Sequence, residues 1–147
     1  NASAADLAVS FHINAGGGDG FEVYYYKTSN EGKKLATICE KHVKTLGQNS
    51  RGVKNGSHLH FIKSTKMTAV LVESFFIDNK KDKTIGDTLA EQTKFGEAYA
   101  RAILEYLGVS YKPKATYKVQ VGAFSDKTNA ETMKRKLETA GFDAIIV

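Results

Sequence analysis

The strongest constraint on the fold is that short apolar segments rich in β-branched residues alternate with amphipathic segments of helical period. Segments 7–13 and 68–73 are almost continuously apolar, as buried strands are. Residues 31–46 instead place apolar side chains three and four positions apart, which predicts a helix. This alternation predicts an α/β fold, a mixed sheet with flanking helices. The expected strands are 7–13, 21–26, 58–62 and 68–73. One helix is expected at 31–46 and a second within 84–107, and 48–57 is expected to be a polar loop.

The single proline, Pro113, marks a boundary between two parts of the chain. It lies in the segment 110–116, which follows the glycine that ends the second helical pattern, so we expect domains at 1–109 and 117–147 with a linker between them. The smaller part predicts a strand at 117–122, a helix at 128–139 and a strand at 143–147. Such a βαβ unit is too small to cover both faces of its sheet, so we expect it to pack against a second copy or another surface.

Composition supports a folded protein and excludes several classes of function. Hydrophobic residues make up 41% of the 147 residues, with seven tyrosines and eight phenylalanines. No apolar run approaches the roughly 18 to 20 residues of a membrane-spanning helix. The lone Cys39 excludes an internal disulfide and a cysteine-cluster metal site. The net charge of +5 comes with no nucleic-acid-binding motif, so nucleic acid is not an expected partner.

The chain opens on Asn1 with neither a basic start nor an apolar signal core. Either no export signal was used or an upstream segment is absent. We favour the second interpretation, and the export route is therefore not visible in the sequence.

Four histidines are candidates for metal binding. His12 ends an apolar strand just before a glycine-rich loop, where α/β sheets commonly bind ligands, although a strand-end histidine is more often structural. His58 and His60 would share one face of a strand and could pair on a metal, but a solvated or aromatic-packed pair is the simpler interpretation. His42 falls on the inner stripe of its helix and is expected in the core or at its edge.

Glu73 is the most informative carboxylate. It follows the apolar run 68–72 and precedes another at 75–77, so burial would raise its pKa and suit it to proton transfer near neutral pH. A glutamate in this position is either paired with a cation or functional, and the pattern alone leaves both open. A second carboxylate, Glu22, falls on the same strand face as Tyr24 and Tyr26. Neither a serine triad around Ser10 nor a phosphate loop at 16–18 is supported, and the glycine-rich segment is expected to be a flexible loop.

Segments 6–15, 20–25 and 64–79, in that order, resemble the zinc-dependent N-acetylmuramoyl-L-alanine amidases of phage endolysins and bacterial autolysins. The run Ser10-Phe-His-Ile-Asn14 matches the Ser-x-His-x-Asn pattern of that family, which implies that His12 is a zinc ligand. The resemblance implies that Glu73 is the catalytic glutamate. The other two expected ligands, a histidine and a glutamate, belong in the family to segments upstream of this chain. Thr68 stands where many relatives have proline, in agreement with the phage branch.

Segments 117–124, 129–130 and 140–144 resemble one half of a sporulation-related repeat (SPOR), a module that binds peptidoglycan. Together the two resemblances imply a hydrolase that cleaves the amide bond between N-acetylmuramic acid and L-alanine, located at the cell wall or outside the cell, with peptidoglycan as partner and zinc as cofactor. They imply that zinc polarises the carbonyl and activates water while Glu73 transfers the proton. The alternative is a peptidoglycan-binding protein that keeps the amidase frame without catalysis.

Overall fold

The computed structural model describes residues 1, 4–112 and 119–146. The chain divides into two compact units, Asn1–Lys112 and Pro113–Val147, which are considered separately below. Among the described residues, no helix combines the length and apolarity needed to cross a bilayer.

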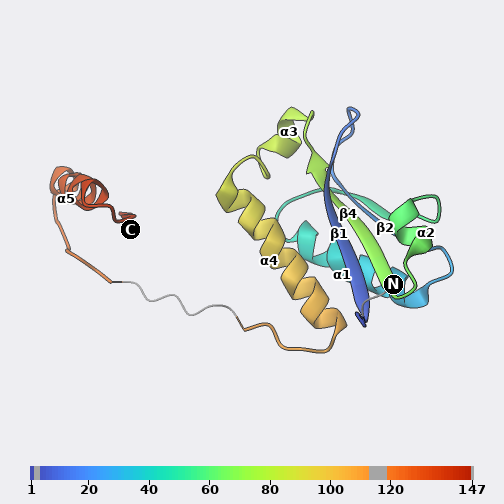
Figure 1. Ribbon diagram of the computed structural model, residues 1–147. Helices are drawn as coiled ribbons and strands as arrows, with labels where there is room; N and C mark the ends of the chain where they lie inside the picture. Colours follow the sequence, from blue (N-terminus) through green and yellow to red (C-terminus); the bar gives the residue numbers. More distant parts are fainter. Residues whose placement is uncertain (2–3, 113–118, 147) are drawn as a thin grey trace. The chain divides into compact units, whose positions relative to one another are not determined.

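The first unit is built on a four-stranded mixed sheet (Figure 1). Its strands are β1 (Leu7–Asn14), β2 (Phe21–Tyr25), β3 (Ser50–Asn55) and β4 (Thr68–Phe76), in the spatial order β1-β4-β2-β3. β1 and β4 pair in parallel, β2 runs antiparallel to β4, and β3 is parallel to β2. The expected α/β class with a mixed sheet is therefore confirmed.

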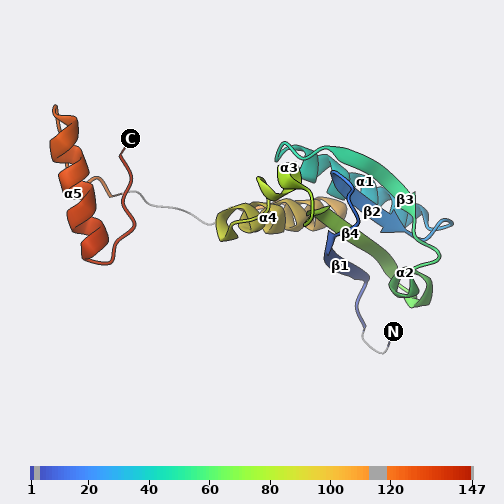
Figure 2. The ribbon, with the colours of Figure 1, turned by 90° about the horizontal axis from the view of Figure 1, so that it is seen from above.

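Helices on both sides cover the sheet. Helix α1 (Asn30–Lys44) begins at the N-cap Ser29 and lies with α4 (Leu89–Tyr106) against one face, while α2 (His60–Ser64) lies on the other, so that α1 and α2 are on opposite sides in Figure 2. The larger core forms on the α1 and α4 face because both helices turn their apolar stripe toward the strands. Its buried residues are Phe21, Val23, Leu35, Ala36, Cys39, Val43, Val70, Val72, Phe75, Phe95, Ala98, Tyr99 and Ala102.

The segment 48–62 corrects two sequence expectations. The expected polar loop contains β3, a sheet-edge strand whose sequence lacks apolar alternation and which pairs with β2 through its backbone. The expected strand at 58–62 is instead a turn followed by α2, which buries Ile62. Gly56 allows this turn, since a Cβ there would lie 2.8 Å from the Cβ of Tyr24. Short apolar runs do not distinguish a strand from one helical turn, which explains the error.

One further boundary differs from the sequence prediction. β4 continues through Phe76, so Glu73 lies within the strand rather than at its end. The helix expected within 84–107 is confirmed: α4 begins at Leu89, where Thr88 and Glu91 form a capping box. A separate short helix, α3 (Lys80–Lys83), precedes it.

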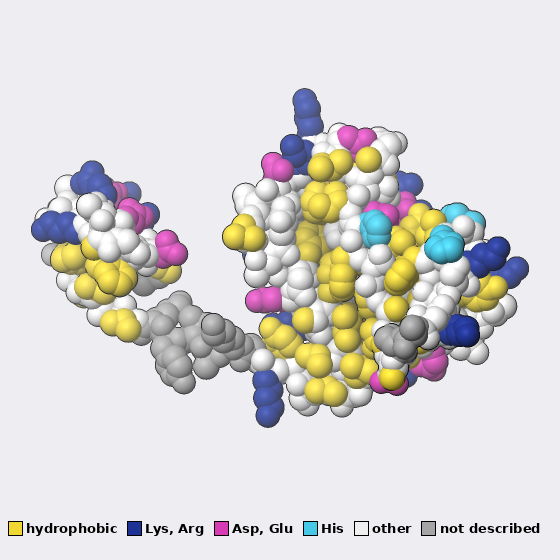
Figure 3. Space-filling view, viewed as in Figure 1, with side chains coloured by type: hydrophobic (Ala, Val, Ile, Leu, Met, Phe, Trp, Pro, Cys, Tyr) yellow, Lys and Arg dark blue, Asp and Glu magenta, His cyan; other side chains and the backbone are white. Residues whose placement is uncertain are grey.

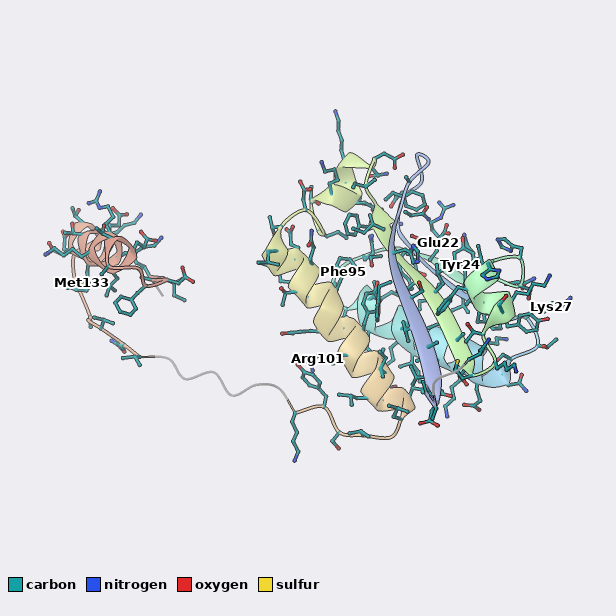
Figure 4. All side chains as sticks on the ribbon, in the orientation of Figure 1. Glu22, Tyr24, Lys27, Phe95, Arg101 and Met133 are labelled. Carbon is teal, nitrogen blue, oxygen red and sulfur yellow. The ribbon has the colours of Figure 1, made fainter. Side chains whose placement is uncertain are left out.

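The described part of the second unit, residues 119–146, contains one helix, α5 (Lys127–Thr139), which starts at the N-cap Asp126 and carries Met133, labelled in Figure 4. The helix expected at 128–139 is confirmed. No strand is present at 119–122 or 143–146, contrary to expectation; the remainder of the two expected strands, together with residues 113–116 of the expected linker, lies outside the described residues. No residue of α5 is buried, and Val119, Val121 and Ile145 are exposed. Strand formation needs a pairing partner, and the described part of this unit offers none.

Candidate functional site

The sheet brings His12 and Glu73 side by side. They are direct partners in the parallel pairing of β1 with β4, so their side chains leave the sheet on the same face. This is the face that carries α2, opposite the large core. In Figure 3 a histidine side chain lies beside acidic side chains in the middle of this face, with further histidines over α2. Two residues 61 positions apart in sequence thus form one candidate site.

One oxygen of the Glu73 carboxylate has no partner. Its Oε2 atom is buried without a hydrogen-bond partner among the described residues, and none of the salt bridges there includes it. Burial raises the pKa of the Glu73 carboxyl above its ordinary value, attraction to His12 opposes this, and repulsion by Glu22 adds to it. The functional interpretation of Glu73 stays a prediction.

Glu22 also belongs to this candidate site, although the sequence predicted only that it shares a strand face with tyrosines. It lies directly opposite Glu73 in the antiparallel pairing of β2 with β4, and its side chain is 4% exposed. Its carboxylate accepts hydrogen bonds from the Tyr24 hydroxyl, the Arg51 Nε and the Lys54 Nζ, the last at 2.7 Å. Glu22 and Tyr24 are labelled together near β4 in Figure 4. The sequence signal was a charged residue on a strand face otherwise occupied by tyrosines.

The electrostatics of this cluster follow from its hydrogen bonds. Burial would raise the pKa of Glu22, but the hydrogen bonds from Lys54, Tyr24 and Arg51 outweigh it and lower the pKa, so Glu22 remains ionised. Burial, together with the bond to Glu22, raises the pKa of Tyr24 to about 12, so its hydroxyl remains a donor. The two carboxylates that face each other across β2 and β4 therefore differ: Glu22 is held charged, and Glu73 is shifted toward the neutral form.

The four histidines lie on different elements of the first unit. His12 is exposed on β1, and its Nε2 lies 2.7 Å from Ser10 Oγ. His58 lies in a turn with its ring edge-on to Tyr24 at 6.3 Å, and His60 starts α2. The idea that these two share one strand face was therefore wrong. His42 contacts Glu105 at 2.7 Å, at the edge of the core as expected.

The glycine-rich loop between β1 and β2 is fastened to the turn after β4. Asp78 Oδ2 accepts from the N–H groups of Gly16 and Gly17, each at 2.8 Å, and the Asn79 amide donates to the Gly18 carbonyl. Asp82 accepts from the N–H of Gly20 at 2.8 Å. The expectation of a simple flexible loop missed these contacts, which connect the end of β1, near His12, to the start of β2, near Glu22.

The described residues do not complete a metal site. No group of three or more His, Cys, Asp or Glu side chains that could hold a metal ion occurs within residues 1, 4–112 and 119–146. His12 offers one exposed imidazole, and the unpartnered Glu73 oxygen lies on the neighbouring strand. Cavities of about 570 and 330 Å³ lie near the start of β4 and around α2, and neither is lined by His12 or Glu73.

Comparison with known protein families agrees with this geometry. Residues 1–105 match the family described as N-acetylmuramoyl-L-alanine amidase, and residues 113–147 match the SPOR domain. The chain is 33% identical over 151 residues to the N-acetylmuramoyl-L-alanine amidase CwlM of Bacillus licheniformis, covering 100% of this chain and 58% of CwlM. It is 38% identical over 120 residues to the endolysin of Bacillus phage SPP1, covering 76% of this chain and 44% of the endolysin.

Solved structures show the same similarity. The catalytic domain of the CD27L endolysin, which targets Clostridia difficile, superposes with a TM-score of 0.64 at 36% identity, covering 71% of this chain and 57% of that one. The catalytic domain of CwlV, an N-acetylmuramoyl-L-alanine amidase from Bacillus (Paenibacillus) polymyxa var. colistinus, gives a TM-score of 0.65 at 31% identity, covering 72% and 60%. The chain thus spans between 44% and 60% of the length of these relatives.

Proposed function

Since residues 1–105 place the chain in the N-acetylmuramoyl-L-alanine amidase family, we propose that the protein is a hydrolase. The bond that it cleaves is the amide between N-acetylmuramic acid and the L-alanine of the stem peptide in bacterial peptidoglycan. The observation that carries this proposal is the pairing of His12 with Glu73, whose buried Oε2 has no hydrogen-bond partner among the described residues. Hydrolysis of an amide requires a group that accepts a proton from water and returns it to the leaving amine. A carboxylate of raised pKa is suited to both steps.

In the proposed mechanism, Glu73 is the general base and then the general acid. The attacking water would lie against the accessible part of the Glu73 carboxylate, and the proton that it gives up would pass to the nitrogen of L-alanine as the amide bond breaks. The raised pKa of Glu73 brings its proton affinity closer to that required near neutral pH. Glu22 supports this role because its fixed negative charge on the adjacent strand favours protonated Glu73.

Members of this family are generally zinc-dependent, and we propose His12 as one protein ligand. When bound in such a site, zinc polarises the amide carbonyl and lowers the pKa of a water molecule. The described residues supply one imidazole rather than the three ligands of a typical catalytic site, so by themselves they do not fit the metal. The proposal for His12 rests on its exposed ring and on its position next to Glu73.

The second unit, which matches the SPOR domain over residues 113–147, is proposed to hold the protein on peptidoglycan. This places the site of action at the cell wall. The positive net charge of +5 would favour contact with anionic wall polymers.

The test is the release of free amino groups from purified peptidoglycan in the presence of zinc. Glu73→Gln preserves shape and removes the proton acceptor, so hydrolysis should fall roughly a hundredfold or more while binding to peptidoglycan is retained. The matched control is Glu97→Gln, the same change at an exposed position of α4, which should leave the rate unchanged. A near-normal rate for Glu73→Gln would show that Glu73 is structural.

One observation favours a second candidate function. Because no three-residue metal group occurs among the described residues, the chain could act as a peptidoglycan-binding protein that keeps the amidase frame without catalysis. Undiminished sedimentation with peptidoglycan, combined with no amino-group release at any zinc concentration, would favour this candidate.

A further inference from the structure

The edge strand β3 places two cationic side chains on the buried carboxylate of Glu22. Arg51 Nε and Lys54 Nζ both bind the same oxygen, Glu22 Oε1, and the Tyr24 hydroxyl binds Oε2. Neither cation forms a salt bridge with Glu73. A single buried carboxylate needs one cation for charge balance, so the second supplies positive charge beyond what Glu22 requires.

Arg51 is held in a defined orientation and still faces solvent. Its Nε atom is fixed by Glu22, and its guanidinium group lies over the Phe76 ring at 5.3 Å from the ring centroid. The side chain is nevertheless 42% exposed, and the described residues provide no hydrogen-bond partner for its two Nη groups. A guanidinium oriented at one edge and open at the other matches the two oxygens of a carboxylate.

The distance from the candidate catalytic pair fits a peptide substrate. His12, Glu73 and Glu22 lie in one row across β1, β4 and β2, and Arg51 extends this row on β3. Neighbouring strands are about 4.8 Å apart, so the backbones of Glu73 and Arg51 are on the order of 10 Å apart. An extended peptide covers about 3.3 to 3.6 Å per residue, so this separation corresponds to roughly three residues.

We propose that the free edge of the Arg51 guanidinium is a carboxylate-binding subsite that receives an acidic group of the peptide stem two to three residues beyond the cleaved amide. This inference rests on the proposed amidase function and adds a substrate preference to it: stems with free carboxylates are bound better than stems whose carboxylates are amidated. Glu22 and Phe76 position the guanidinium and do not contact the substrate.

The experiment is an NMR titration of the full chain with two synthetic ligands. One is N-lactyl-L-Ala-γ-D-Glu-L-Lys with free carboxylates, and the other is the same peptide with both carboxylates amidated. Both lack the glycan, so they report on the peptide site rather than on glycan binding. The amide signal of Gly52, the residue after Arg51 in β3, is a local reporter.

We expect the acidic peptide to bind about tenfold more tightly than the amidated one, with a shift of the Gly52 signal. Arg51→Gln should remove this preference while the amidated peptide binds as before. Lys27→Gln, which removes one positive charge at an exposed position after β2, should keep the preference and so excludes a general charge effect. Figure 4 shows Lys27 away from Glu22.

Four outcomes would overturn the inference. Equal binding of the two peptides, or a preference that survives Arg51→Gln, would remove the subsite and leave the proposed amidase function intact. Tighter binding of glycerol phosphate than of the acidic peptide, with the same Gly52 shift, would assign the site to a wall polymer instead. Failure of both peptides to bind would overturn the substrate assignment and the inference together. An unchanged circular dichroism spectrum shows that Arg51→Gln is folded.

Discussion

Removal of the Asp82 carboxylate should destabilise the first unit by several kcal/mol. Asp82 is 1% exposed, and its Oδ2 accepts hydrogen bonds from the backbone N–H groups of Gly20 and Phe76, both at 2.8 Å. In Asp82→Ala both buried donors lose their acceptor. An unsatisfied buried donor costs about 1 to 3 kcal/mol, so the two together give about 2 to 6 kcal/mol. That is a large share of the roughly 5 to 15 kcal/mol that stabilise a typical domain.

Urea unfolding followed by circular dichroism would measure this loss. Asp82→Asn keeps an oxygen acceptor and should cost less than Asp82→Ala. Asp78→Ala is the matched control, because Asp78 also accepts two backbone N–H bonds but is exposed, so water replaces the lost acceptor. A loss below about 1 kcal/mol for Asp82→Ala would refute the reasoning, since it would mean that Gly20 and Phe76 find other partners at little cost.

Three further predictions concern pH, anchoring and metal. The folded-state pKa of Glu73 lies above its ordinary value because of burial, so the folded state binds more protons, and stability should fall as pH rises from the ordinary glutamate pKa through the folded pKa. Glu73→Gln should remove this loss, and urea midpoints that vary equally with pH in both proteins would contradict it. Deletion of residues 111–147 should weaken sedimentation with insoluble peptidoglycan while the first unit stays folded by circular dichroism, and unchanged sedimentation would show that this segment is not the anchor. With His12 as its one expected ligand, the chain should retain zinc weakly or not at all through dialysis, as measured by metal analysis; stoichiometric retention would redirect attention to His58 and His60.

Burial patterns in the sequence were sufficient for the main elements of the fold. The continuous apolar run before Glu73 predicted a buried strand, and this strand is β4, which lies between β1 and β2. The helical spacing within 31–46 likewise predicted α1 to within two residues. These features are local, since period and capping depend on residues a few positions apart.

Similarity to short family motifs identified His12 and Glu73 as the candidate pair, because burial and spacing alone did not. From burial and spacing, His12 was more simply a structural histidine, and Glu73 was equally well explained as part of an ion pair. Motif similarity selected these two residues, and the register of β1 with β4 then placed them side by side. The roles of the two residues remain proposals, whereas their proximity is a property of the sheet.

What only the tertiary structure decided is the surroundings of that pair. Arg51 and Lys54 lie in a segment that the sequence predicted to be a polar loop. They form salt bridges with Glu22 because β3 pairs with β2. The fastening of the glycine-rich loop by Asp82 likewise joins residues 62 positions apart. The physical reason is that a sequence pattern encodes which side chains are buried along one element, while ion pairs and backbone hydrogen bonds between elements depend on strand order and register.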